Sequence, residues 1–239
     1  MKRKRRRRVS VLLVALLVGA LVGAGWYLLH GRPNSASLGP AATTPKSAPG
    51  EPIAVAIDHV ESGNEGRNVV ISGALRVTAP ARDTELGIGA DALALLRQVE
   101  MRQWRETCAA AICEYALIWA TKPIDWHPFR DRAGHENSMP FPFSSQRFLA
   151  AAVRLGAFNV DPALASAAIA PVAYPVHVAQ LPPNLAATFR DQDGVLYTGA
   201  AASPPAPGDL RISYRIVPAG EQRLSGVQKG DHLTAPALH

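Results

Sequence analysis

The stretch Val9–Leu29 constrains this chain most, because it holds 21 residues and no charged side chain. A helix of this length spans about 30 Å, the thickness of the hydrocarbon core of a bilayer. Seven consecutive basic residues, Lys2–Arg8, come directly before it and should stay on the cytoplasmic side of a membrane. The sequence therefore predicts a basic cytoplasmic segment (residues 1–8), one transmembrane helix (residues 9–30) and a chain that continues beyond the membrane.

The alternative for the same apolar stretch is a signal peptide that is cleaved. The apolar cores of signal peptides run about 7–15 residues, whereas this one is longer and its best cleavage site, Ser35-Ala36-Ser37, is poor. We therefore interpret the stretch as an uncleaved signal anchor. Gly19 and Gly23 would let two such helices approach closely, although glycine is also common in membrane spans.

Composition separates this anchor from a folded domain. Residues 31–52 are rich in Pro, Ser, Gly and Ala and are expected to form a flexible linker. One domain is expected over residues 53–239. The formal net charge of +6 comes from the first eight residues, because the other Lys and Arg are balanced by 19 Asp and Glu. With no Lys/Arg stripe interleaved with aromatic residues along the sequence, nucleic-acid binding is not expected.

Alternating apolar residues and turn signals predict an α+β fold that is mostly β, with one or two short helices. Asp161 and Pro162 are expected to begin a short helix that ends near Ala170. Periodicity does not decide between helix and strand for Asp91–Glu106. The expected strands are Ile53–Val60, Asn68–Thr78 (with a bulge at Gly73 and an end at Pro80), Glu114–Thr121, one or two within Phe148–Phe158, Val195–Tyr197, Asp209–Val217, and a hairpin over Gln222–Leu233.

The two cysteines, Cys108 and Cys113, are separated by four residues. This spacing fits a hairpin closed by a disulfide, and a compartment outside the cytoplasmic membrane is oxidising enough to form one. In that case both flanking segments would be strands. Two reduced structural thiols are the alternative.

Several segments together resemble the transmembrane protein 43 (LUMA) family over about residues 65–233. They are Val99–Trp104, Lys122–Asp125, Ala133–Asn137, Leu155–Phe158, Gly208–Ser213 and Gly230-Asp231. The resemblance implies a membrane protein with a large domain on the non-cytoplasmic side and implies no catalytic residues. Animal members look like organisers of the inner nuclear membrane and partners of lamina-associated proteins.

Two departures from the family pattern bear on this resemblance. Arg102 stands where the family has an aromatic residue, and the family's further membrane spans near the C-terminus have no counterpart before His239. The chain is therefore expected to be a shortened member or a truncated one. Its Ala- and Arg-rich composition suggests a bacterial source, to which a lamina role cannot transfer.

The densest group of candidate metal ligands is His127, Asp131 and His135, with Glu136 beside them. Imidazole and carboxylate groups would have to converge at about 2.0–2.2 Å from a zinc ion. Pro128 and Gly134 favour a loop here, so the alternative is a loop whose polar groups bond to its own backbone. We expect no cofactor and no catalytic residue.

The tryptophans are candidates for either core or binding surface. We expect Trp104 and Trp119 in the core, and Trp126, beside Asp125 and His127, at the surface.

Together these features predict a non-enzymatic, single-span protein of the bacterial inner membrane. Its periplasmic β-rich domain would act as a scaffold or binding module, with the lipid bilayer and protein partners, or a second copy of itself, as its contacts. The alternative is a membrane-anchored periplasmic enzyme that depends on a metal held by the three candidate ligands.

Overall fold

The computed structural model describes residues 51–201 and 203–236. The predicted basic segment, transmembrane helix and nearly all of the linker lie outside these residues. Within the described ranges, none of the helices combines the length and the apolar character that crossing a membrane requires.

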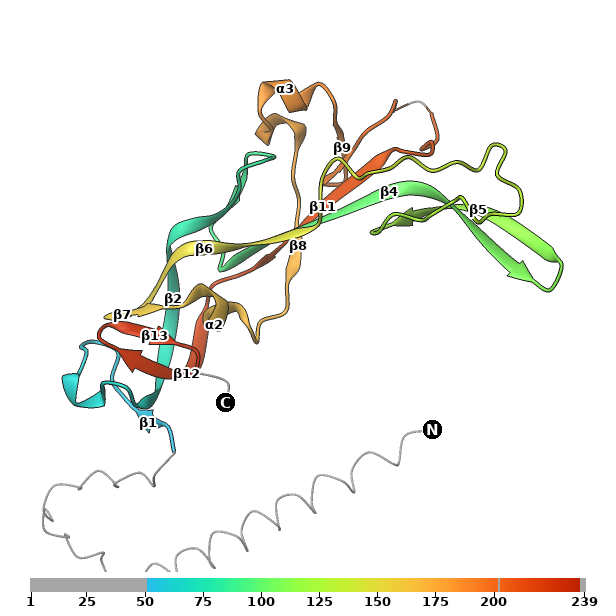
Figure 1. The fold of residues 1–239 in the computed structure, drawn as a ribbon. Coiled ribbons are helices and arrows are strands. Elements are labelled where there is room, and N and C mark those ends of the chain that lie inside the picture. The colour runs from blue at the N-terminus through green and yellow to red at the C-terminus, as the bar shows by residue number, and fades with distance from the viewer. Residues whose placement is uncertain (1–50, 202, 237–239) are drawn as a thin grey trace, which may run out of the picture. The chain divides into compact units, whose positions relative to one another are not determined.

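The described residues are mostly β, as predicted (Figure 1). Short helices interrupt the strands: η1 (Ser62–Asn64), α2 (Pro162–Ser166), η2 (Val178–Gln180) and α3 (Pro183–Ala186). The strands are β1 (Ile53–Ala54), β2 (Asn68–Asp83), β3 (Ile88–Ala90), β4 (Ala94–Ala109), β5 (Ile112–Ala120), β6 (Gln146–Leu155), β7 (Phe158–Val160), β8 (Val172–Tyr174), β9 (Arg190–Gln192), β10 (Val195–Tyr197), β11 (Leu210–Val217), β12 (Glu221–Lys229) and β13 (His232–Thr234).

Five of these strands close into a ring. In the order β2, β12, β13, β7 and β6, each strand pairs with the next, and β6 pairs back onto β2. Ile71, Leu155, Phe158 and Leu233 fill its interior, each of them almost completely buried. At about 25 cal/mol per Å² of apolar surface removed from water, such side chains stabilise the ring by roughly 1.5–3 kcal/mol each.

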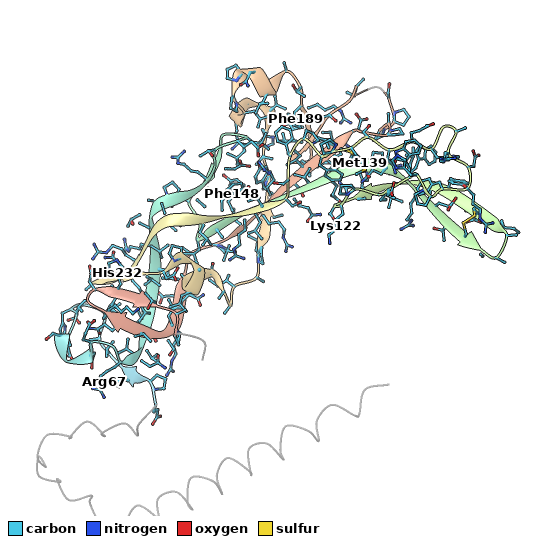
Figure 2. The ribbon with its side chains drawn as sticks, viewed as in Figure 1. Arg67, Lys122, Met139, Phe148, Phe189 and His232 are labelled. Carbon is cyan, nitrogen blue, oxygen red and sulfur yellow. A yellow bond between two sulfur atoms is a disulfide. The ribbon has the colours of Figure 1, made fainter. Side chains whose placement is uncertain are left out.

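A second sheet continues from the ring through β4. This strand pairs with β6 over Ala94–Arg97, with β11 over Ala94–Met101 and with β5 over Met101–Ala109. β10 and β9 follow beyond β11. One face of this sheet packs Met101 and Ile212 into a separate core. Figure 2 labels Phe148 and Phe189, which also pack in this core.

Strand β4 resolves the ambiguity over Asp91–Glu106 in favour of a strand. Periodicity could not decide, because β4 is buried on one face only along part of its length. Hydrogen bonding to β11 on one side and to β5 on the other fixes the extended backbone.

Two predictions about β2 were wrong. The strand does not end at Pro80 but runs to Asp83, and its register shift lies between Val77 and Ala79 and not at Gly73. A proline is tolerated there because β12 pairs with β2 only as far as Ala74 and β3 only from Ala81, so at Pro80 one edge of β2 has no paired strand among the described residues. Gly73 leaves room for a neighbouring side chain: a Cβ at this position would lie 2.8 Å from Cδ1 of Ile57, which would have to shift.

Two elements are shorter than predicted. β1 stops at Ala54 and not at Val60, because the chain turns so that the carbonyl of Ile57 accepts a 2.7 Å bond from the N–H of Ala157. Helix α2 begins where predicted, with the Asp161 carboxylate accepting from the N–H of Ala163. It ends at Ser166 and not near Ala170, because the N–H of Ala167 bonds back to Leu164 and tightens the last turn.

A buried ionic group joins β2, β4 and β11. Arg97 donates to Asp83 at 2.8 Å, and both side chains are fully inaccessible to solvent. Arg97 also donates to Glu85 at 2.6 Å, and the Tyr214 hydroxyl donates to Asp83 at 2.7 Å. Burial, followed by this bond to Asp83, raises the pKa of Tyr214 far above its ordinary value. Arg97 is therefore compensated on both sides, as a buried guanidinium must be.

The Asp83→Asn substitution should lower the free energy of unfolding by about 3 kcal/mol, because it leaves Arg97 buried without one of its two carboxylates. Urea denaturation of the full chain in detergent, followed by tryptophan fluorescence, measures this. The Asp91→Asn substitution, at an exposed site, is the matched control and should change stability by less than about 0.5 kcal/mol. Equal effects of the two substitutions would contradict the assignment.

Candidate functional site

A row of arginine and aromatic side chains crosses one face of the second sheet. We define this arginine–aromatic row as Arg190, Tyr197, Arg211, Trp119 and Arg102. Register places them together. Arg190 pairs with Tyr197 across β9 and β10, Tyr197 pairs with Arg211 across β10 and β11, and Arg102 pairs with Trp119 across β4 and β5. Directly paired residues of antiparallel strands lie on the same face, so the five side chains are neighbours.

The contacts within the row alternate cation and ring. The guanidinium carbon of Arg211 lies 4.9 Å from the ring centroid of Trp119, and that of Arg102 lies 5.6 Å from the same ring. Arg190 lies 4.9 Å above Tyr197, whose ring meets Trp119 edge-on at 6.1 Å. Each such cation–π contact at a half-exposed site stabilises the arrangement by about 0.5–1 kcal/mol.

Glu100 fixes the middle of the row. Its two carboxylate oxygens accept from Nε and Nη2 of Arg211, both at 2.8 Å. This bidentate bond raises the pKa of Arg211 and sets the plane of its guanidinium. The Nε atoms of Arg102 and Arg190 are buried without a hydrogen-bond partner, and both guanidinium groups pack on rings, while Nη1 of Arg190 also donates to Gln192 at 3.4 Å. With three arginines and one glutamate, the row is a rigid, net positive, half-exposed surface.

Sequence reasoning did not predict this row. Its members come from five strands and are spread over residues 102–211, so no linear stripe of basic and aromatic residues exists. The signal that could have found it is the alternation in Asp209–Val217, which turns Arg211 away from the core side of the strand. The absence of a linear stripe therefore did not exclude a basic and aromatic surface.

Trp104 and Trp119, predicted in the core, belong to neither buried cluster. Trp119 is half-buried in the row, and Trp104 lies edge-on to His135 at 4.7 Å. Both tryptophans lie on the face of β4 and β5 that carries Arg102, opposite the core residue Met101, so neighbouring side chains cover them only partly. Trp126 is also half-buried and stacks on His127 at 4.6 Å.

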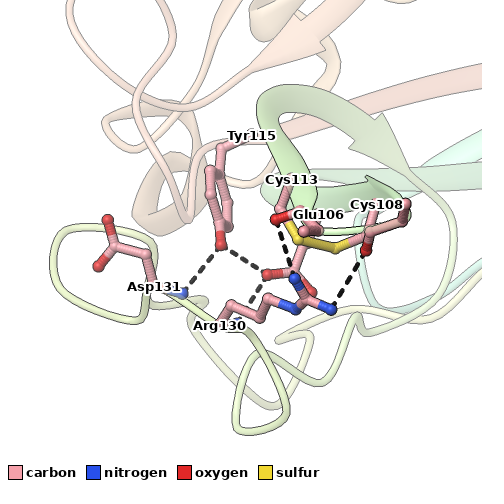
Figure 3. The surroundings of a disulfide bond; sticks show 8 residues. Glu106, Cys108, Cys113, Tyr115, Arg130 and Asp131 are labelled. Atoms are coloured by element: carbon pink, nitrogen blue, oxygen red, sulfur yellow. Dashed lines mark hydrogen bonds between the residues drawn. A yellow bond between two sulfur atoms is a disulfide. The ribbon is translucent and has the colours of Figure 1, made fainter.

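The far end of the β4–β5 hairpin carries a disulfide (Figure 3). Cys108 and Cys113 pair directly across the two strands and are bonded, with Cα atoms 4.0 Å apart. The guanidinium of Arg130 donates to the carbonyls of Ala110 and Ala111 in the turn. The loop after β5 is thereby attached to the turn of the hairpin.

Tyr115 and Glu106 make a second attachment of the same loop. The Tyr115 hydroxyl donates to Glu106 at 2.6 Å and accepts from the N–H of Asp131 at 2.8 Å. Glu106 also accepts from the N–H of Arg130 at 2.7 Å. The hydrogen bond to Glu106 is the main cause that raises the pKa of Tyr115, and the bond from Tyr115 is the main cause that lowers the pKa of Glu106.

The three candidate metal ligands all lie in this loop but serve different contacts. The His127 ring bonds to Asp125 at 2.6 Å, and the His135 ring stacks on Tyr115 at 4.0 Å with Nδ1 at 3.1 Å from the carbonyl oxygen of Asp131. Asp131 takes part only through its backbone: its N–H donates to the Tyr115 hydroxyl, and its carbonyl oxygen lies near Nδ1 of His135. Across residues 51–201 and 203–236, Glu106, Cys108 and Cys113 are the one trio of His, Cys, Asp or Glu residues whose ligand atoms converge. Its sulfurs are joined to each other and offer no thiolate.

The hydrogen bond between Tyr115 and Glu106 should stabilise the attachment of the loop only over a limited range of pH. Because the pKa of Glu106 is lowered in the folded state, Glu106 adds to the free energy of unfolding above its unfolded-state pKa. This addition is lost as the pH falls through the folded-state pKa. Because the pKa of Tyr115 is raised in the folded state, its addition to the free energy of unfolding is present below its unfolded-state pKa. It is lost as the pH rises through the folded-state pKa of Tyr115. The Glu106→Gln substitution should move the titration of Tyr115 down toward the ordinary pKa of about 10.

A pH titration of the Tyr115 Cζ signal by NMR measures this shift. The Glu114→Gln substitution, at an exposed neighbour on β5, removes the same charge outside the pair and should leave the titration unchanged. A Tyr115 titration that is identical in the Glu106→Gln variant and the natural protein would show that the bond is not formed in solution.

Comparison with known proteins gives one consistent family. A sequence model described as Transmembrane protein 43 matches residues 100–235. The chain is 31% identical over 114 residues to "Transmembrane protein 43 homolog" of Drosophila melanogaster, covering 42% of this chain and 30% of the fly protein. It is 28% identical over 199 residues to "Transmembrane protein 43" of Rattus norvegicus, covering 74% of this chain and 49% of the rat protein.

The chain thus spans half or less of the length of these two relatives. No solved structure matches it. The range matched by the family model contains all five residues of the arginine–aromatic row and the disulfide.

Proposed function

Because the chain belongs to the transmembrane protein 43 family, we propose that it is a membrane-anchored, non-enzymatic scaffold of the cell envelope. Its β-rich domain binds an acidic segment of a protein partner through the arginine–aromatic row. The rigid alternation of cations and rings along that row is the observation that carries the proposal.

The composition of the row supports a protein partner. Trp, Tyr and Arg are the residues enriched at the energetic centres of protein interfaces. In this row each arginine is already ordered against a ring, so binding would cost little side-chain entropy. One glutamate among three arginines leaves positive charge to be matched, which favours an acidic partner.

The proposal of a membrane anchor depends on the sequence of residues 1–30. An apolar run of 21 residues behind seven basic residues is typical of a single-span protein with a cytoplasmic N-terminus. Such an orientation places the domain on the periplasmic side. The bond between Cys108 and Cys113 supports this side, because disulfides persist in oxidising compartments.

The anchor predicts a simple fractionation result. The full chain should stay with membranes after carbonate extraction, and a chain lacking residues 1–30 should become soluble. Deletion of residues 31–46 removes linker alone and is the matched control, which should remain in the membrane fraction. A soluble natural product that begins near Leu38 would instead establish a cleaved signal peptide.

The binding surface predicts site-specific crosslinking. A photo-crosslinking residue in place of Leu117, which lies on the same face of β5 as Trp119, should capture an acidic envelope protein in cells. Adding Arg211→Gln or Trp119→Ala should reduce the yield of that product about tenfold, since each removes an interface anchor.

The control is Arg223→Gln, which removes an exposed arginine from β12 and should leave the crosslinked product unchanged. Capture of a second copy of the chain would make self-association the function of the row. Equal yields from the row variants and the natural chain would contradict the proposed surface.

A further inference from the structure

A pocket of about 440 Å³ opens beside β4, toward its N-terminal half. Its lining includes Leu96 and Gln98 of β4, Gln146 and Arg147 of β6, Arg215 of β11 and Thr121 just after β5. Leu96 and Gln98 lie on the same face of β4 as Glu100 and Arg102, so the pocket and the arginine–aromatic row share one face of the sheet.

The register sets Arg147 and Arg215 on opposite sides of one residue. Arg147 pairs with Leu96 from β6, and Arg215 pairs with Leu96 from β11. Two inter-strand spacings separate their backbones by roughly 10 Å. Long guanidinium side chains that start 10 Å apart on one face can both reach a small group seated above Leu96.

Each of these two arginines is held by neutral oxygens. Arg147 Nη2 donates to the Ser166 hydroxyl at 2.7 Å and to the Ser166 carbonyl at 3.4 Å. Arg215 Nη2 donates to the Pro171 carbonyl at 2.6 Å. A guanidinium has five N–H donors, so these contacts fix each group and leave most of its donors for a ligand.

These two arginines differ from Arg97 and Arg211 of the second sheet. Arg97 is neutralised by Asp83 and Glu85, and Arg211 by Glu100. Arg147 and Arg215, in contrast, bond within the described ranges of the chain to neutral acceptors. Both side chains are exposed, and the residues that line the pocket include no acid. The pocket therefore keeps two positive charges.

We propose that this pocket binds an oxyanion, a phosphate or carboxylate group, held between Arg147 and Arg215. Guanidinium forks match the planar edge of a carboxylate and two oxygens of a phosphate. The amide of Gln98 and the hydroxyl of Thr121 add neutral donors around the same opening. The anion belongs either to a free small molecule or to the headgroup of an acidic lipid.

Binding should be measured on the full chain in zwitterionic detergent by isothermal titration calorimetry. The probes are inorganic phosphate, citrate and monomeric dihexanoyl phosphatidic acid. Saturable binding of phosphate or citrate identifies a site for free anions, whereas saturable binding of the short-chain lipid alone identifies a headgroup site. Arg147→Gln and Arg215→Gln should each weaken the binding about tenfold, because each removes a charge-assisted contact.

Two further variants distinguish binding by the two pocket arginines from a general effect of positive charge. Arg215→Lys retains the charge but loses the fork, so its affinity should fall between those of the natural chain and Arg215→Gln. Arg223→Gln, which removes an exposed arginine of the ring, should bind as the natural chain does. Absence of saturable binding of all three probes would overturn the proposal, as would equal weakening by Arg223→Gln or no weakening by both pocket variants.

This inference stands apart from the proposed scaffold function. The pocket variants leave every residue of the arginine–aromatic row in place, and the row variants leave Arg147 and Arg215 in place. Loss of anion binding with intact crosslinking, or the reverse, would therefore show which of the two assignments fails.

Discussion

The pairing of β4 on both of its edges is the constraint on which the rest of the structure depends. This strand of 16 residues bonds to β6 at its start, to β11 along its first half and to β5 along its second half. Through β6 it is joined to the closed ring, and through β5 it carries the disulfide-bonded hairpin. Successive side chains of β4 point to opposite faces of the sheet. Leu95, Val99 and Met101 pack inward. The opposite face, with Leu96, Gln98, Glu100 and Arg102, carries the row and the pocket.

The sequence predicted the elements whose signals are local. The hairpin over Gln222–Leu233, the strand Asp209–Val217 and the start of α2 at Asp161 all depend on alternation, turn residues or a cap within a few positions. The extent of β2 could not be predicted, because Pro80 fits the strand only where β12 and β3 leave one edge of β2 unpaired, and these partners are not read from the residues around Pro80. For the same reason the helix-or-strand question for β4 is decided by its partners and not by its own periodicity.

The candidate site was less predictable than the fold. Motif reasoning favours residues that are close in sequence, and it singled out His127, Asp131 and His135, which the structure assigns to separate local contacts. The arginine–aromatic row joins residues from five strands, so only the register reveals it. The near-zero net charge of the domain also gave no reason to expect a basic surface such as the arginine–aromatic row. A near-neutral domain can still carry a strongly basic face, because balance along the chain says nothing about distribution over a surface.

Two different uses of arginine meet on this one face. In the row, rings and Glu100 order each guanidinium before any partner arrives, which suits an interface that depends on shape and low entropic cost. In the pocket, Arg147 and Arg215 are oriented by neutral oxygens and keep their full charge, which suits a small anion. Because both sets lie on the even-numbered side of β4, an anion held above Leu96 would sit four residues along the strand from the bond between Glu100 and Arg211. At about 3.4 Å per residue that separation is about 14 Å, which exceeds the Debye length of about 8 Å at physiological salt. Screening therefore weakens the electrostatic coupling between the pocket and the row, so an anion in the pocket would change the potential at the row only slightly.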